Sequence, residues 1–147
     1  MNSNETLKVI GDVDMVLTSA DGSVKDKREI KNLVVTNGLN FIASRIRDAS
    51  ASVMSHMAVG SGTAAAALAN AALGTELGRV ALSATTVNAN QVVFTATFPA
   101  GTGTGAITEA GIFNAGTAGT MLCRTVFSVV NKDAGDTLSI TWTVTIS

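Results

Sequence analysis

The side chains best suited to chemistry in this sequence are few and scattered. His56 is the single histidine and Cys123 the single cysteine among 147 residues. A metal site needs clustered ligands, and a nucleophilic thiol needs a base beside it. His56 instead begins a short apolar stretch, and Cys123 lies in an alternating one, where a lone thiol usually acts as a small core hydrophobe. We therefore predict no catalytic residue and no metal ligand at these two positions.

Two glycine-rich segments resemble phosphate-binding loops in composition only. Residues 60–63 read GSGT and residues 101–105 read GTGTG. Neither has the Gly-Lys-Ser/Thr ending of a P-loop, nor the strand-to-helix setting of a dinucleotide site. Two acidic pairs could offer oxygen ligands: Asp12 with Asp14, and Asp133 with Asp136. Neither pair matches the spacing of a calcium loop, so we predict no cofactor and no metal.

Four charged residues stand inside stretches that otherwise read as apolar strands: Glu76, Arg79, Glu109 and Arg124. A carboxylate in such a setting needs a partner. Two interpretations follow, namely structural Glu–Arg pairing, within the chain or between subunits, and a hydrolytic carboxylate pair. Hydrolysis would also need a substrate cleft that the sequence does not indicate. We favour structural pairing and predict that the protein is not an enzyme.

Composition points to a protein that packs against other proteins. Apolar residues make up 46% of the chain and charged residues only 14%, against about 25% charged in an average domain. A surface of low charge loses its water at little cost on association. The net charge of −1 argues against nucleic acid as a partner. Residues 1–6 lack the features of a signal peptide and no apolar run reaches 18 residues, so we expect synthesis in the cytoplasm and no membrane contact.

The spacing of apolar residues predicts a mainly β protein. Residues 138–146 alternate Leu, Ile, Trp and Val with Ser and Thr, and residues 91–98 repeat this period of two. The other predicted strands are residues 7–18, 24–30, 31–35, 57–60, 76–84, 107–113 and 121–130. The first two would form a hairpin at Asp21-Gly22. Residues 121–130 are apolar on both faces, which fits a central strand or one that a partner covers.

One segment has helical spacing. Its apolar face would contain Leu39, Ile42, Ala43 and Ile46. We predict a helix of about three turns that begins near Asn37, whose side chain would cap the free N–H groups, and that lies across the sheets. The alanine-rich residues 63–72 fit either a helix or an extended loop. We expect a single domain over residues 1–147, with residues 1–30 as an N-terminal arm or hairpin.

Five segments resemble structural proteins of tailed bacteriophage virions. They are residues 31–43 (KNLVVTNGLNFIA), 57–63 (MAVGSGT), 73–79 (LGTELGR), 98–114 (FPAGTGTGAITEAGIFN) and 121–127 (MLCRTVF). Together they cover most of the chain from Lys31 onward. The family that the sequence resembles best is the capsid cement, or decoration, proteins of short-tailed phages, and related modules resemble parts of tail fibres.

This resemblance implies a jelly-roll β-sandwich of about eight strands with one short helix, bound to the exterior of the virion capsid. The implied partners are the major capsid protein and further copies of the chain, as a dimer or a trimer. No catalytic residue is transferred, and the four charged residues named above become structural positions. The contact surfaces would be the arm over residues 7–30, the segment 63–72 and the exposed strand edges.

A tail-fibre module is the alternative. Such modules recognise receptors, and glycan binding favours exposed aromatic side chains. Here aromatic residues make up 4% of the chain, there is no tyrosine, and the one tryptophan falls in a core strand. A third hypothesis, a depolymerase, needs a carboxylate pair or metal cluster in a cleft. The sequence therefore favours the cement protein over both.

Overall fold

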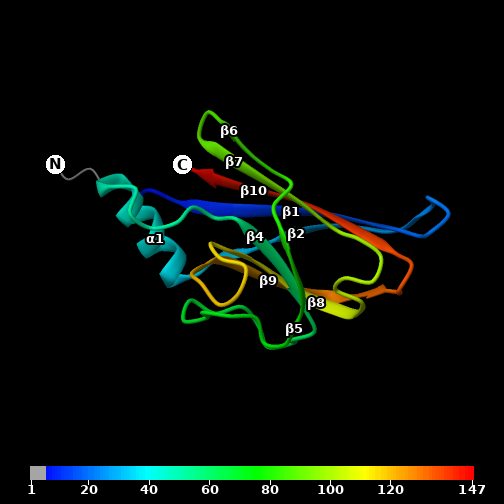
Figure 1. Ribbon diagram of the computed structural model, residues 1–147. Coiled ribbons are helices and arrows are strands. Elements are labelled where there is room, and N and C mark those ends of the chain that lie inside the picture. Colours follow the sequence, from blue (N-terminus) through cyan, green and yellow to red (C-terminus); the bar gives the residue numbers. More distant parts are fainter. Residues whose placement is uncertain (1–5) are drawn as a thin grey trace.

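Two antiparallel sheets face each other in the computed structural model, which describes residues 6–147 (Figure 1). Sheet A has the strand order β2 (Val24–Lys31), β1 (Val9–Thr18), β10 (Thr137–Ile146), β7 (Gln91–Phe98) and β6 (Ala84–Asn88). Sheet B has the order β3 (Leu33–Val34), β9 (Met121–Lys132), β8 (Gly105–Phe113), β4 (His56–Gly60) and β5 (Glu76–Ala81). The predicted β-sandwich is confirmed, with ten strands in the described residues where about eight were expected.

The core lies between the sheets and follows the predicted alternation. On β10 the buried side chains include Ile140 and Trp142, and on β7 they include Phe94 and Phe98. Sheet B contributes its own alternate positions, such as Met57, and together these residues form one continuous cluster. Because each strand turns every second side chain inward, the period of two in the sequence identifies the buried face directly.

The N-terminal hairpin forms as predicted, but its first strand is not an arm. β1 pairs with β10 over ten positions and with β2 on its other side. Met15 and Leu17 of β1 are buried in the core. The term "arm" therefore fits only β2 and the turn after β1, where Gly22 has a φ of +89°. Residues 1–5 of the expected arm lie outside the described residues.

One predicted strand proves to be two. Residues 76–84 were expected to form a single strand, but β5 ends at Ala81 in sheet B and β6 begins at Ala84 in sheet A. The chain thus passes from one sheet to the other within two residues. The predicted strand 31–35 also divides, since Lys31 closes β2 and only Leu33–Val34 forms β3. The sequence pattern of an extended segment does not show which of the two sheets each of its residues joins.

The predicted helix is confirmed as α1 (Thr36–Arg47), but its cap and its packing face were wrong. Val35 precedes the helix with extended backbone and makes no side-chain capping bond, so Asn37 lies inside the first turn. Ile46 is 83% exposed, and of the predicted face only Ile42 packs against the core. Gly38 is the buried residue. A Cβ at this position would overlap the carbonyl of Leu122 on β9. Glycine is therefore needed where the helix approaches β9 most closely.

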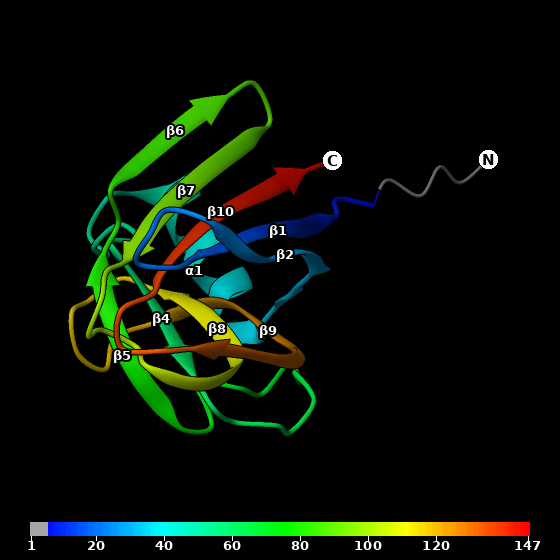
Figure 2. The ribbon, with the colours of Figure 1, turned by 90° about the vertical axis from the view of Figure 1, so that its right-hand side faces the viewer.

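The helix lies near one end of the sandwich, beside β9 (Figures 1 and 2). Its contact face contains Gly38, Phe41, Ile42 and Arg45, which have the spacing i, i+3, i+4 and i+7. In the part of the chain described, no helix combines the length and apolar character needed to cross a bilayer.

Candidate functional site

A buried ion pair occupies the middle of sheet B. Glu109 on β8 and Arg124 on β9 are 0% and 2% exposed. Arg124 Nη2 donates to Glu109 Oε2 over 2.8 Å, and Arg124 Nε donates to the same oxygen over 3.0 Å. The two residues come from neighbouring antiparallel strands, which brings them side by side although they are 15 positions apart. The predicted structural pairing therefore holds for these two residues, and it lies within one chain.

Backbone N–H groups complete the surroundings of the Glu109 carboxylate. Gly62 and Thr75 each donate to Oε1 over 2.8 Å, and Gly74 donates to Oε2 over 2.9 Å. With the two bonds from Arg124, the carboxylate accepts five hydrogen bonds. Since an ionised carboxylate offers about four lone-pair sites, this one is fully engaged. It has no lone pair left with which to take a proton from a substrate.

Glycine is required where the backbone approaches this carboxylate. A Cβ on Gly60 or on Gly62 would come within 2.5 Å of Glu109 Oε1. The segment 60–63 was compared above with phosphate-binding loops, and its backbone does hold an anion. That anion is the side chain of the protein itself. Gly62 supplies one N–H group and residues 74–75 supply two more, so backbone donors from two segments surround the negative group.

The surroundings of Glu109 keep it ionised. Burial raises the pKa of the Glu109 carboxyl, but hydrogen bonds from Thr75 and Gly74, from Arg124 and from Gly62 lower it by more, so the net shift is downward. A pKa below the ordinary range leaves the group negative at neutral pH. At neutral pH Glu109 is thus a structural anion.

The same ion pair anchors a long exposed loop. We call residues 61–75, between β4 and β5, the anchored loop. Arg124 Nη1 donates to Asn70 Oδ1 over 3.0 Å, and that oxygen also accepts from the N–H of Ala67. Thr108 Oγ1 donates to the carbonyl of Gly62 over 2.7 Å. Of the two structures open for residues 63–72, the loop is therefore correct, and it is fixed in place by buried polar groups.

The other two charged residues of the predicted pairing, Glu76 and Arg79, contact each other on edge strand β5. Arg79 Nη2 lies 2.7 Å from Glu76 Oε1. Arg79 also donates to the carbonyls of Ala115 and Ala118 over 2.9 Å each, and its guanidinium lies 3.9 Å from the centre of the Phe113 ring. This pair therefore attaches the β8–β9 connection to the edge of sheet B.

His56 and Cys123 lie in structural settings. His56 begins β4, and its Nδ1 is 2.8 Å from Ser55 Oγ. Cys123 on β9 is fully buried, and burial raises the pKa of its thiol far above the ordinary range. A thiol that stays protonated is a poor nucleophile.

The acidic pairs also have protein partners. Lys25 on β2 lies 2.6 Å from Asp136 and 3.1 Å from Asp133, and this contact raises the pKa of Lys25 and lowers that of Asp136. Asp12 pairs with Lys31 across the β1–β2 ladder. Among residues 6–147 there is no group of three or more His, Cys, Asp or Glu side chains placed to hold a metal ion.

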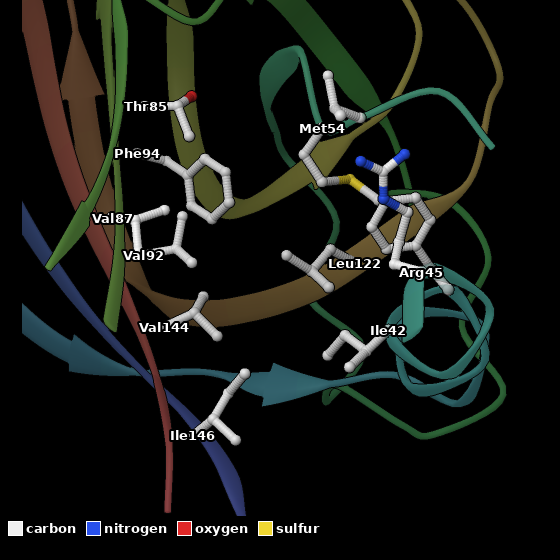
Figure 3. Close-up of a pocket in the computed structure, with 12 residues that line it drawn as sticks. Ile42, Arg45, Met54, Thr85, Val87, Val92, Phe94, Leu122, Val144 and Ile146 are labelled. Atoms are coloured by element: carbon white, nitrogen blue, oxygen red, sulfur yellow. The ribbon is translucent and has the colours of Figure 1, made fainter. Parts of the chain in front are cut away.

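An apolar pocket that no sequence pattern indicated lies at the end of the sandwich that holds α1 (Figure 3). The pocket, of about 400 Å³, opens between α1 and sheet A, with apolar side chains on both walls (Figure 3). Ile42 faces it from the helix side, Phe94 and Val144 from sheet A, and Val87 from β6. Arg45 is the one charged residue in the lining, and its Nη1 donates to the carbonyl of Ala51. The pocket is thus an apolar surface beside the edge of sheet A.

Comparison with known proteins gives no relative. No family model matches the sequence, and neither a curated protein nor a solved structure matches it.

Proposed function

We propose that this protein is a cement, or decoration, protein of a tailed-bacteriophage head. It binds the exterior of the capsid, contacts the major capsid protein and stabilises the contacts between neighbouring capsid subunits. It acts as a homo-oligomer and has no enzymatic activity. Its effect on the shell follows from mass action, because a protein that binds only the assembled state shifts the equilibrium toward assembly.

The anchored loop is the observation that carries this proposal. Residues 63–72 read TAAAALANAA, contain no charge and are mostly exposed. Such a surface sheds water at little cost. Because Glu109 and Arg124 hold the loop from beneath, its backbone is ordered before any partner arrives. A loop fixed in advance loses less conformational entropy on binding than a mobile one.

Four of the five segments that carry the phage resemblance contribute residues to this anchor. Gly60 and Gly62 lie in the segment 57–63, Gly74 and Thr75 in 73–79, Glu109 in 98–114, and Arg124 in 121–127. The resemblance therefore includes the residues that hold the loop in place. This supports a protein whose shared feature is a rigid docking surface, with no shared catalytic group.

The test is binding to heads that lack this protein. Purified protein is mixed with empty capsids and sedimented, and the shells are then challenged with heat and with low salt. We expect saturable binding at a fixed copy number and a higher temperature of shell disruption. A folded protein that fails to bind would contradict the proposal and favour the alternative of a tail structural module.

A variant in the loop sharpens this test. Leu68 is an exposed apolar residue of the anchored loop, and Ile46 on α1 is an exposed apolar residue outside it. We expect Leu68→Asp to weaken capsid binding by more than tenfold, because a buried unpaired charge at an interface costs well over about 1.4 kcal/mol. Ile46→Asp is the matched control and should bind like the unaltered protein. Equal binding by both variants would exclude the loop as the contact surface.

A further inference from the structure

The two edges of sheet A differ in charge. Edge strand β2 carries six charged residues among its eight: Lys25, Asp26, Lys27, Arg28, Glu29 and Lys31. Edge strand β6 carries none among its five, and all five are exposed. Charged side chains on an edge discourage the addition of another strand, whereas an exposed edge without charge is a template for one. The chain therefore protects one edge of this sheet and leaves the other open.

The β2 edge is also occupied by contacts within the chain. Arg28 donates to the carbonyls of Ser128 and Val129 on β9, and Lys25 reaches the turn before β10. By contrast, β6 pairs with β7 on one side, and no strand among residues 6–147 lies on its other side (Figure 2). Alternate residues of β6 then direct backbone N–H and C=O groups toward that side.

The side chains of β6 favour a partner strand as well. Thr85 and Val87 face the apolar pocket, and Val87 is 71% exposed (Figure 3). Thr86 lies between them and points to the opposite face of the sheet, because side chains alternate along a strand. A strand added beside β6 would cover part of Val87 and extend the wall of the pocket that Val87 and Thr85 form.

We propose that the occupant of this edge is β6 of a second copy of the chain, paired antiparallel about a two-fold axis at Thr86. In this register Thr86 faces its own counterpart, and Thr85 of each copy faces Val87 of the other. Thr–Thr and Thr–Val pairs are favourable across antiparallel strands, and no charge is buried at any position. The contact is self-complementary, as a two-fold interface must be, and it joins the two copies of sheet A into one continuous sheet.

The proposed β6–β6 contact adds a specific interface to the proposed function, in which the cement protein is a homo-oligomer. To that extent the contact rests on the proposed function. The experiment nevertheless uses the full chain alone in solution. Failure to dimerise and failure to bind capsids are therefore separate results. A protein that dimerises but leaves heads unbound would keep this inference and overturn the proposed function.

Charge placed on the axis tests the register. Thr86 is exposed, so Thr86→Lys and Thr86→Glu should keep the melting temperature that the unaltered protein has when dilute enough to be monomeric. Each variant places like charges opposite each other across the axis, and we expect each to be at least tenfold weaker in self-association. An equimolar mixture of the two should form a Lys–Glu heterodimer, observed by sedimentation velocity and native mass spectrometry. Thr97→Lys is the matched control, since Thr97 is an exposed threonine on the face of β7.

The outcomes separate clearly. A dimer that both single variants abolish, that their mixture restores and that Thr97→Lys leaves intact would establish the contact. An unaltered protein that stays monomeric up to about 100 µM, or a dimer that survives in Thr86→Lys, would overturn it. Dissociation without recovery in the mixture would also overturn it, because a two-fold contact at Thr86 requires the opposite charges to meet.

Discussion

The two Glu–Arg pairs of sheet B have the same chemistry and different surroundings. Glu109 and Arg124 lie on adjacent inner strands, are almost completely buried and hold the anchored loop through backbone N–H groups. Glu76 and Arg79 lie on edge strand β5, where the Glu76 side chain is partly exposed, and hold the β8–β9 connection through carbonyl groups. Water can reach Glu76 and hydrogen-bond to it if Arg79 is lost, but water cannot reach Glu109 or Arg124. Burial, more than the ion pair itself, therefore decides how much each pair determines the structure.

The largest effect is expected when one partner of the buried pair is removed. Arg124→Met leaves the Glu109 carboxylate buried without its cation and removes the bond that ties Asn70 of the anchored loop to β9. We expect the free energy of unfolding to fall by about 3–5 kcal/mol, as for other buried pairs that lose one partner. Urea denaturation followed by tryptophan fluorescence would measure this, since Trp142 lies in the core. A loss below about 1 kcal/mol would show that the three N–H groups suffice.

Acid should test the buried pair in a second way. Because the pKa of Glu109 in the folded protein is below its ordinary value of about 4.5, its ionisation stabilises the fold above that ordinary value. This contribution is lost as the pH falls through the lowered pKa of the folded state. We expect the stability of the unaltered protein to fall more steeply below pH 4.5 than that of Glu109→Gln, which cannot titrate there. Parallel urea titrations at neutral and acidic pH measure the difference, and parallel losses in both proteins would contradict it.

The smallest effect is expected at the pair of Glu76 and Arg79, in which the Glu76 side chain is partly exposed. Glu76→Gln removes one charge, but Arg79 keeps its bonds to Ala115 and Ala118 and its contact with Phe113. We expect a loss of less than about 1 kcal/mol, as is usual for partly exposed ion pairs. The same denaturation assay measures it. A loss as large as that of Arg124→Met would mean that partner placement, and not burial, sets the importance of these pairs.

Periodic patterns in the sequence predicted most strands because burial alternates with them. The alternation over Leu138–Ile146 identified the buried face of β10 correctly. Pairing between the charged residues of the apolar strands could also be predicted from the sequence, because a buried charge needs a partner of opposite sign. The three N–H donors were not, because Gly62, Gly74 and Thr75 act through the backbone, which has no side-chain signal, and lie 34 to 47 positions away from Glu109.

Other features depend on tertiary contacts that no local pattern encodes. β6 was not separated from β5, because Ala84–Asn88 is exposed throughout and shows no alternation of burial. The contact face of α1 was misjudged because Gly38, with no apolar side chain, is the point of closest approach to β9. The pocket beside Val87 arises where the helix and sheet A meet, and its lining comes from six separate stretches of the chain.

The burial of Cys123 makes the native protein a convenient subject for site-specific labelling. Its thiol is inaccessible and remains protonated at neutral pH, so it should not react with maleimides or disulfide reagents while the sandwich is closed. A cysteine introduced at a surface position would then be the one reactive thiol, without removal of the natural residue. Conversely, the rate at which Cys123 itself is slowly modified would measure how often sheet B opens away from sheet A.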